Sequence, residues 1–442
     1  MDIRIIVETT AETGDKRTHE LRRLRLSSQG HGDLGLKLED AKDTLGQLQE
    51  AVLNAQIEEV CQACRCCPGC NRSRRVHDYR PMVVDTLFGR FRVTVPRLRK
   101  CSCIIGNRGS FSPFAQVFPD RATPELQRLQ AELGARHSFR EAARIMETFL
   151  PCAKPHNTTV RNRLGRIAES ITKADTPTNE TSSSLPVTVF IDGAHIRCGP
   201  EYQKRHLDVV VGKIETRDMC RRFGLAPQGA SSPATQLRRD LAELGWNGCR
   251  PVTVISDGEA ALSNLVRGAT DGKVQHILDW WHISMRVQHV ENAIKGLVQA
   301  ENFPGIAVIF RKPAETLRWY LWHGKVQTAG TDLQWLMVDC ARLSKEDPAV
   351  REAASRALAR YYALYSNLDH NMGSLANFGR RYRHGQPIST SRAEGCVDDI
   401  GNAHMGKRRR MRWSPCGAHN VAITRAAVLD GRLSVSEPKI AA

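Results

Sequence analysis

Aspartates follow short runs of strand-forming residues in this sequence, and acids at such positions can bind divalent cations. In VFIDGAHIR, residues 189–197, Asp192 follows valine, phenylalanine and isoleucine, and in VTVISDGEA Asp257 follows a similar run. In QHILDWWH, residues 275–282, Asp279 follows a similar apolar run. A single Asp-Gly pair is commonly a turn, but ligand sites in open α/β sheets gather beyond the carboxyl ends of strands. The repetition therefore favours a site at one sheet edge, with the first strand ending at Asp192.

Converging carboxylates of this kind suit hard cations such as Mg²⁺ or Mn²⁺, which prefer oxygen ligands. In a basic protein the obvious use is phosphodiester chemistry, in which two ions stabilise the attacking and leaving oxygens. A third acid should come from an element near the end of the domain, and TSRAEGCVDDIG offers Glu394, Asp398 and Asp399. Glu394 and Asp398 share a helical face, so spacing alone leaves the choice open.

The charge balance indicates a polyanionic partner. The chain has 64 Lys and Arg against 47 Asp and Glu, a net charge of +17, which favours nucleic acid or an acidic membrane surface. A run of cations neutralises phosphates without reading base sequence, although a solvated basic face is the alternative. The cations that we predict to contact DNA here are Arg380, Arg381, Arg383, Lys407, Arg408, Arg409, Arg410 and Arg412.

The composition is that of a folded globular protein. The 442 residues are 41% hydrophobic and 25% charged, which suits two to four domains. The sequence has no apolar run long enough for a membrane span, and MDIRIIVETT lacks the features of a signal peptide. We therefore expect a cytoplasmic protein that associates with the nucleoid when it binds DNA.

Cysteines are crowded into one short segment. Seven of the 14 cysteines lie between Cys61 and Cys103, flanking two expected strands at 82–88 and 91–95. Two short cysteine pairs on a hairpin suit tetrahedral zinc, which also stabilises so small a unit. Free structural cysteines are the alternative, and Cys61 and Cys64 form a substitute pair. The expected ligands are Cys67, Cys70, Cys101 and Cys103.

Helices are expected on both sides of this hairpin. Apolar residues at 38, 41, 45, 48, 52 and 55 predict a helix with a narrow apolar face, suited either to self-association or to packing within the chain. Three more helices begin near Thr123, Ser138 and Thr158. They are similar to a helix-turn-helix whose third helix reads a DNA groove, or they form a plain helical connector. The expected DNA contacts on the third helix are Arg161, Arg163 and Arg166.

An α/β pattern follows a polar stretch at 173–186, which has the composition of an interdomain linker. Strands are expected at 187–191, 207–214, 252–256 and 274–278, and helices at 233–244 and 260–266. Residues 281–365 are expected to be almost entirely helical, and a further helix is expected at 391–403.

The acids and their contexts, FIDGAH, ISDGEA and TSRAEG, resemble the acidic triad of DDE transposases with an RNase H-like fold. The chain most closely resembles bacterial insertion-sequence transposases of the ISKra type, which are distant relatives of Mutator-like elements. The likeness extends, in order, over LGLKLEDAKDTLGQLQ, VPRLRKCSC, DWWHISMRV and RMRWSPCGAHNVAITRAAV. The resemblance implies that Asp192, Asp257 and Glu394 are the catalytic residues and hold two Mg²⁺ or Mn²⁺ ions.

The resemblance also implies a multidomain α/β organisation. The segments expected are an N-terminal strand and helical arm at 1–58, a zinc-binding β-hairpin at 59–110, a helix-turn-helix region at 111–172, a linker at 173–186, an RNase H-like mixed sheet at 187–301 and 377–442, and an all-helical insertion at 302–376. Such relatives carry an acid or a cysteine separated by two residues from a histidine, matched here by Asp279 and His282. His282 is therefore expected near the scissile phosphate, with a satisfied core histidine as the alternative.

The implied activity is transposition. The enzyme would bind the ends of a mobile element, hydrolyse phosphodiesters there and transfer the freed 3'-hydroxyl to target DNA, and paired ends imply at least a dimer. Two other functions fit the same residues. One is a zinc-containing DNA-binding regulatory protein with an inactive RNase H-like domain, and the other is a metal-dependent nuclease without strand transfer.

Overall fold

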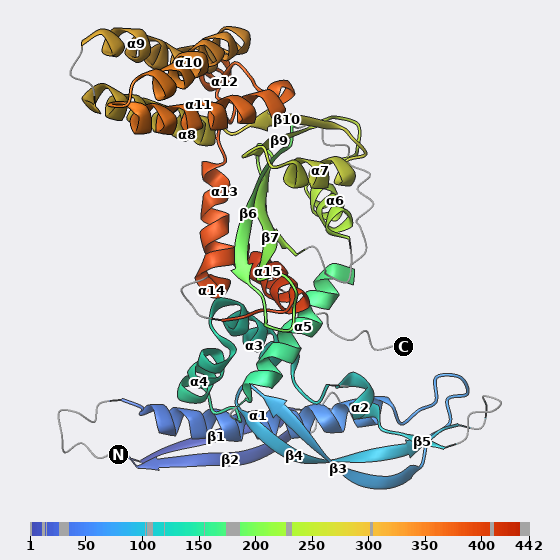
Figure 1. The fold of residues 1–442 in the computed structure, drawn as a ribbon. Coiled ribbons are helices and arrows are strands. Elements are labelled where there is room, and N and C mark those ends of the chain that lie inside the picture. The colour runs from blue at the N-terminus through green and yellow to red at the C-terminus, as the bar shows by residue number, and fades with distance from the viewer. Residues whose placement is uncertain are drawn as a thin grey trace. The chain divides into compact units, whose positions relative to one another are not determined.

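The protein is a mixed α/β chain with several sheets, seen in a computed structural model (Figure 1). The chain divides into two compact units, Met1–Ser170 with Arg432–Ala442, and Ile171–Gly431. The side chains of 300, 304–308 and 392–394 lie outside the described part, as does most of the expected linker. The described residues are 2–10, 14, 16–25, 35–101, 103, 109–118, 120–153, 155–173, 186–226, 232–300, 304–406 and 411–433.

The first unit begins with a two-stranded antiparallel ribbon, β1 (Asp2–Thr10) and β2 (Lys16–Arg25), followed by the long helix α1 (Leu38–Ala63). Ion pairs tie the ribbon to α1, and Arg22 Nη2 lies 2.8 Å from Asp40 Oδ1. An isolated ribbon is marginally stable in water, so these contacts with α1 support it.

Helix α1 buries a different face from the one that its apolar spacing predicts. Leu53, Ile57 and Cys61 are its buried residues, and they pack with the hairpin that follows. Leu38, Leu45 and Val52 of the predicted apolar face are exposed. Packing within the chain therefore uses the C-terminal half of the helix.

A three-stranded antiparallel sheet follows, formed by β3 (Val76–Thr86), β4 (Gly89–Arg99) and β5 (Ser110–Phe111). Strand β3 begins and ends earlier than the expected 82–88, and β4 extends past the expected 91–95 at both ends, so that the pairing already starts at Val76 and Leu98. Alternate residues face the α1 core, where Val84, Val93 and Val95 are buried.

Four helices complete the first unit: α2 (Pro113–Val117), α3 (Pro124–Arg136), α4 (Phe139–Phe149) and α5 (Asn157–Lys173). The Ser138 hydroxyl accepts the Glu141 N–H at 3.3 Å and caps α4, as the sequence pattern predicts. Helices α3 and α5 approach closely at Gly134, where a Cβ would lie 2.9 Å from Val160 Cγ1.

The second unit is built on a five-stranded sheet of order β10-β9-β6-β7-β8. Its strands are β6 (Thr188–Arg197), β7 (His206–Glu215), β8 (Cys220–Leu225), β9 (Val252–Ser256) and β10 (Val274–Leu278). Strands β6, β9 and β10 are parallel, whereas β7 is antiparallel to both β6 and β8. Helices α6 (Pro233–Glu243) and α7 (Ala260–Ala269) cover one face, with Leu237, Leu241, Leu262 and Val266 packed on the sheet.

Strand β6 does not end at Asp192, which corrects the sequence expectation. It continues to Arg197, and Asp192 and Gly193 pair with Val211 and Val210 of β7. Only the parallel pairing of β6 with β9 ends near Asp192, because its last residue pair is Phe190 and Ile255. Cross-strand pairing with β7 overrides the local turn preference of Asp-Gly.

A helical region follows β10, formed by α8 (Trp280–Ala300), α9 (Pro304–Trp322), α10 (Val326–Glu346), α11 (Arg351–His370), η1 (Met372–Ser374) and α12 (Phe378–Arg383). Its core, which includes Leu317, Leu333 and Tyr361, is continuous with Phe190 and Ile255 of the sheet. The helical region therefore shares its core with the end of the sheet, where η1 contacts β10.

The chain then returns to the sheet through α13 (Ser391–Cys396), the π-helical turn η2 (Val397–Asn402), α14 (Ala403–Met405) and α15 (Pro415–Leu429). Helix α13 packs on β6 and β7, and α15 packs on β8 (Figure 1). The close approach depends on glycine, since a Cβ at Gly401 would lie 2.7 Å from Ala194 Cβ. No helix in the described part is both long enough and apolar enough to cross a membrane.

The Gly401 contact gives a stability prediction. Gly401→Ala should lower the free energy of unfolding by about 1–3 kcal/mol, because the added methyl group has to displace Ala194 or the turn itself. Gly330→Ala in α10 is the matched control, since its Cβ would meet nothing within 4 Å and alanine favours the helix. Urea unfolding of both variants measures the difference; equal stabilities would contradict the close packing.

Candidate active site and metal centre

The sheet register brings three aspartates to one edge. Asp192 and Asp257 each follow the last β6–β9 register pair, Phe190 and Ile255, by two residues. Asp279 and Asp257 each come directly after the last β9–β10 pair. Because the three strands are parallel and adjacent, Asp192 within β6 lies level with Asp257 and Asp279 at the carboxyl ends of β9 and β10.

The environment of Asp192 disfavours its charge. Burial raises the pKa of Asp192, and the negative charges of Asp257 and Asp279 raise it further, while the Gly193 N–H and His282 lower it. The Gly193 N–H lies 2.7 Å from Asp192 Oδ1. Two carboxylates therefore lie close enough to repel each other, an arrangement that a bound cation would relieve.

Asp257 lies at a turn that requires glycine. Its Oδ1 accepts the Glu259 N–H at 2.9 Å, just before α7 begins. Gly258 has a φ of +94°, and a Cβ there would lie 2.7 Å from Leu278 Cδ1 and 2.8 Å from Asn371 Nδ2. Gly258 therefore forms the turn that follows β9, and the same turn places Asp257 at the end of that strand.

Asp279 differs from the other two acids because protein donors satisfy its buried carboxylate. It is 0% exposed and accepts Trp281 N–H at 2.9 Å, His282 Nδ1 at 2.6 Å, and Thr390 N–H and Oγ1 at 3.2 and 2.7 Å. These hydrogen bonds lower the pKa of Asp279 although burial opposes them. Asp279 therefore joins the start of α8 to the segment that leads into α13.

His282 is held in place by Asp279. The hydrogen bond from Nδ1 to Asp279 raises the pKa of His282, and the charges of Asp279, Asp257 and Asp192 add to this effect against burial. The side chain is 24% exposed. With Nδ1 committed to Asp279, Nε2 is the ring nitrogen that can donate to a substrate.

Glu394 is carried by α13, which packs on β6 and β7, but its side chain lies outside the described part. The two alternative acids follow on η2. Asp398 accepts the Asn402 Nδ2 group at 2.9 Å. Asp399 influences the pKa values of Arg222 and Cys396, which places it near Arg222 of β8.

Four cysteines of the first unit form a candidate metal centre. The Sγ atoms of Cys67, Cys70, Cys101 and Cys103 all lie within 4.8 Å of one another. The Cys67–Cys103 and Cys70–Cys101 separations are 3.5 and 3.3 Å, well beyond a disulfide bond of about 2.05 Å. Sulfurs bound to one zinc ion at about 2.3 Å lie about 3.8 Å apart. The cluster can therefore hold a metal ion such as zinc.

The peptide groups around these cysteines favour thiolates. The Gly69 N–H is the main cause that lowers the pKa of Cys67 to about 6, and the Cys103 N–H lowers the pKa of Cys101. Cys61, by contrast, is buried in the α1 core, and burial raises its pKa. The substitute pair that includes Cys61 is therefore not part of the cluster.

The arginines predicted on α5 do not share one exposed face, which corrects the sequence prediction for Arg163. Its side chain is only 11% exposed, lies 3.9 Å from Asp85 and donates to Gln130 Oε1. Burial lowers the pKa of Arg163. Arg161 is exposed, and the exposed Arg166 forms an ion pair with Asp120.

The basic residues near α13 also divide into two groups. Arg381 is half-buried and donates to the Pro387 carbonyl oxygen at 3.2 and 3.1 Å, so it supports the chain rather than a DNA surface. Arg380, Arg383 and Arg412 are exposed. The other predicted DNA contacts, Lys407, Arg408, Arg409 and Arg410, lie outside the described residues.

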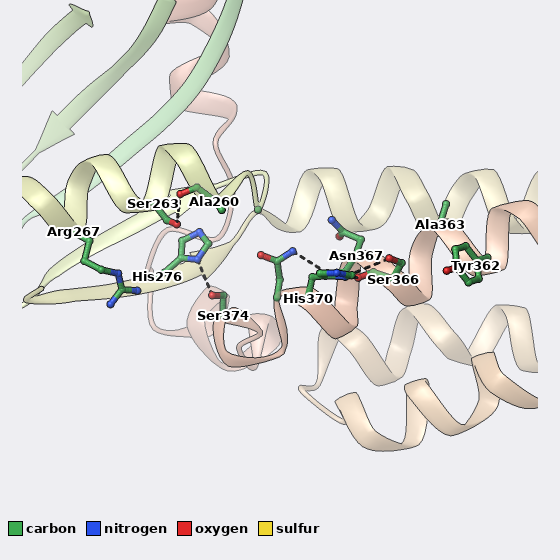
Figure 2. A pocket seen from close by; sticks show the side chains of 12 residues that line it. Ala260, Ser263, Arg267, His276, Tyr362, Ala363, Ser366, Asn367, His370 and Ser374 are labelled. Atoms are coloured by element: carbon green, nitrogen blue, oxygen red, sulfur yellow. Dashed lines mark hydrogen bonds between the residues drawn. The ribbon is translucent and has the colours of Figure 1, made fainter. Parts of the chain in front are cut away.

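An open cavity of about 650 Å³ begins at Gly258 and lies between α7 and α11 (Figure 2). Figure 2 shows Arg267 and His276 on one side and His370 on the other. His276 is held between Ser256 Oγ at 2.8 Å and Ser374 Oγ at 2.7 Å. The sequence did not predict this cavity, because its residues come from segments far apart in the chain that have no common motif.

No protein-family model matches this chain, and no curated protein matches it either.

The cysteine cluster predicts one tightly bound zinc ion per chain. Cys67→Ser and Cys101→Ser should each lose the metal and destabilise the first unit, because a structural zinc site contributes folding energy. Cys66→Ser is the matched control, since Cys66 is an exposed cysteine between the same elements but outside the cluster. Metal analysis of the purified chains measures the content; wild-type protein without metal would refute the assignment.

The Asp279–His282 pair predicts a pH dependence. The pKa of His282 is higher in the folded protein than in the unfolded chain, where it is about 6.5. Protonated His282 therefore stabilises the fold below about pH 6.5, and this stabilisation is lost as the pH rises through the folded pKa. The lowered pKa of Asp279 gives stability that is present above about pH 3.9 and lost as pH falls through the folded pKa.

The contribution of this pair should therefore be largest between about pH 4 and 6.5. Asp279→Asn should bring the His282 pKa down and cost about 3 kcal/mol, as measured by NMR titration of the ring and by urea unfolding. An unchanged His282 pKa in this variant would exclude the pairing, and Asp398→Asn on the exposed face of η2 is the control.

Proposed function

We propose that this chain is a DDE transposase of a bacterial insertion sequence, which binds the ends of the element and moves them to target DNA. One observation carries the proposal. Asp192 and Asp257 stand level on neighbouring parallel strands, where the charge of Asp257 raises the pKa of Asp192 and both acids raise that of His282. Coupled groups of this kind are typical of catalytic sites.

The sheet topology supports an RNase H-like core with a helical insertion. Strand β6 is central, with β7 and β8 on one side and the parallel strands β9 and β10 on the other. The helices α8 to α12 intervene between β10 and α13, and α13 then packs on β6 and β7. An RNase H-like site with a helical insertion is expected to have this order of elements, with two aspartates on strands and a glutamate on a helix that follows the insertion.

The donor set fits Mg²⁺ or Mn²⁺. Asp192 and Asp257 offer oxygen donors. Burial raises the pKa of Asp192, and the negative charge of Asp257 raises it further. The nearby His282 already donates its Nδ1 proton to Asp279. Asp192, Asp257 and Glu394 would hold two ions. Such ions activate water and stabilise the charge that develops on phosphate oxygens.

The residues of the chain would divide the remaining work. His282, whose pKa is raised, would be protonated and donate from Nε2 to a phosphate oxygen. Asp279 is a positioning residue that fixes the ring and the segment at Thr390. The exposed Arg161, Arg380 and Arg412 would bind DNA phosphates and give a salt-dependent affinity.

The proposed reaction has two displacements at phosphorus. Water first attacks a phosphodiester at the end of the element, and the bond to the 3'-oxygen breaks to leave a 3'-hydroxyl and a 5'-phosphate. That 3'-hydroxyl then attacks a phosphodiester of the target, which releases the 3'-hydroxyl of the target strand. Joining two element ends in one event requires at least a dimer.

The carboxylates give the decisive prediction. Asp192→Asn and Asp257→Asn should each reduce cleavage and joining of end-containing DNA by about 1,000-fold or more, because each would remove a metal ligand. DNA binding should remain, since the cationic residues are unchanged. The assay uses labelled element ends with Mg²⁺ or Mn²⁺ and separates cut from joined strands.

The third acid is tested in the same assay. Glu394→Gln should be as defective as Asp192→Asn, whereas Asp398→Asn and Asp399→Asn should retain activity, since they lie on η2 beyond α13. Activity that survives in Asp192→Asn or Glu394→Gln would refute the site assignment. Cleavage without joining by the wild-type protein would instead identify a nuclease.

A further inference from the structure

Two adjacent tryptophans at the start of α8 have different environments. The Trp280 ring packs in the helical region, with its centroid 4.8 Å from Trp322 and 5.0 Å from Phe378. Trp281 is 42% exposed. One indole therefore serves the core, and the other presents apolar surface beside the candidate active site.

The backbone of Trp281 is held at the start of α8. Its backbone N–H donates to Asp279 Oδ1 at 2.9 Å, and its carbonyl oxygen accepts the Ser284 hydroxyl at 3.0 Å. Its ring stands at 90° to the His282 ring, with the centroids 5.0 Å apart. Single exposed apolar residues are normal on protein surfaces, but the ring of this one lies against His282, and its backbone is held by the same carboxylate that orients His282.

The location of Trp281 indicates what its exposed face could bind. A nucleobase is joined to its own phosphate through a single sugar, so a ring beside the group that contacts the phosphate is within reach of the base. Every base has a π-face, and stacking on an aromatic side chain tolerates any sequence. A base paired within a duplex, by contrast, has both faces covered by its neighbours.

We propose that Trp281 stacks on an unpaired nucleobase next to the phosphate that His282 contacts, and so holds the DNA strand in the active site. The inference rests on the proposed function and adds to it that the DNA is locally unpaired at the site. Trp281 then acts as a positioning residue for the strand, whereas Asp192 and Asp257 act on the phosphate.

The test uses the full-length chain and a short single-stranded oligonucleotide with one 2-aminopurine, whose position is varied along the strand. Calcium replaces magnesium, so that binding is observed without cleavage. For at least one position, wild-type protein should quench the 2-aminopurine fluorescence. Trp281→Ala should bind about tenfold more weakly and lose that quenching, whereas Trp281→Phe should keep most of both.

Two further variants make the result specific. Trp335→Ala removes an indole that is 67% exposed on α10 and should behave as wild type. Trp281→Leu keeps an apolar side chain without a π-face and replaces the alanine variant if that protein does not fold. Quenching and affinity within twofold of wild type in both the alanine and the leucine variants would overturn the stacking proposal.

Cleavage assays with Mn²⁺ separate this inference from the proposed function. Quenching that depends on Trp281 in a protein that never cuts DNA would support stacking and refute the transposase. Cutting and joining that proceed equally well in wild type and Trp281→Ala would refute stacking alone.

Discussion

A carboxylate that is fully buried needs hydrogen-bond donors around it, and Asp279 takes them both from the residues that follow it and from Thr390, which lies 111 residues further along the chain. The donors at the start of α8 fix His282 and Trp281, and the donors of Thr390 fix the segment that enters α13. A buried charge that loses its partners costs several kcal/mol. The segment that enters the helix carrying Glu394 is thus held by an acid whose two oxygens both accept hydrogen bonds from the protein.

The three strand acids show how the surroundings divide one residue type into different roles. Asp279 receives four hydrogen bonds, which lower its pKa although burial opposes them. Asp192 accepts the neighbouring Gly193 N–H, and burial raises its pKa. An apolar run precedes both acids, but Asp279 has local donors in Trp281 and His282 and a distant one in Thr390.

Local patterns predicted those parts of the fold that depend on local physics. The strands β9 and β10, the cap at Ser138 and the four clustered cysteines agree with the structure because apolar runs, capping and ligand spacing are properties of short segments. The continuation of β6 past Asp192 depends on pairing with β7, and the burial of Arg163 depends on Gln130 and Asp85. Such partners lie far away in the sequence, so spacing alone could not reveal them.

The charges at the site also constrain how DNA could enter it. Asp192, Asp257 and Asp279 face one histidine, so the cluster is acidic when all of them are ionised, although the chain as a whole carries +17. A phosphodiester would be repelled by such a cluster at short range. If the proposed function holds, cations would therefore have to bind before or together with DNA, because they are needed to neutralise the acids.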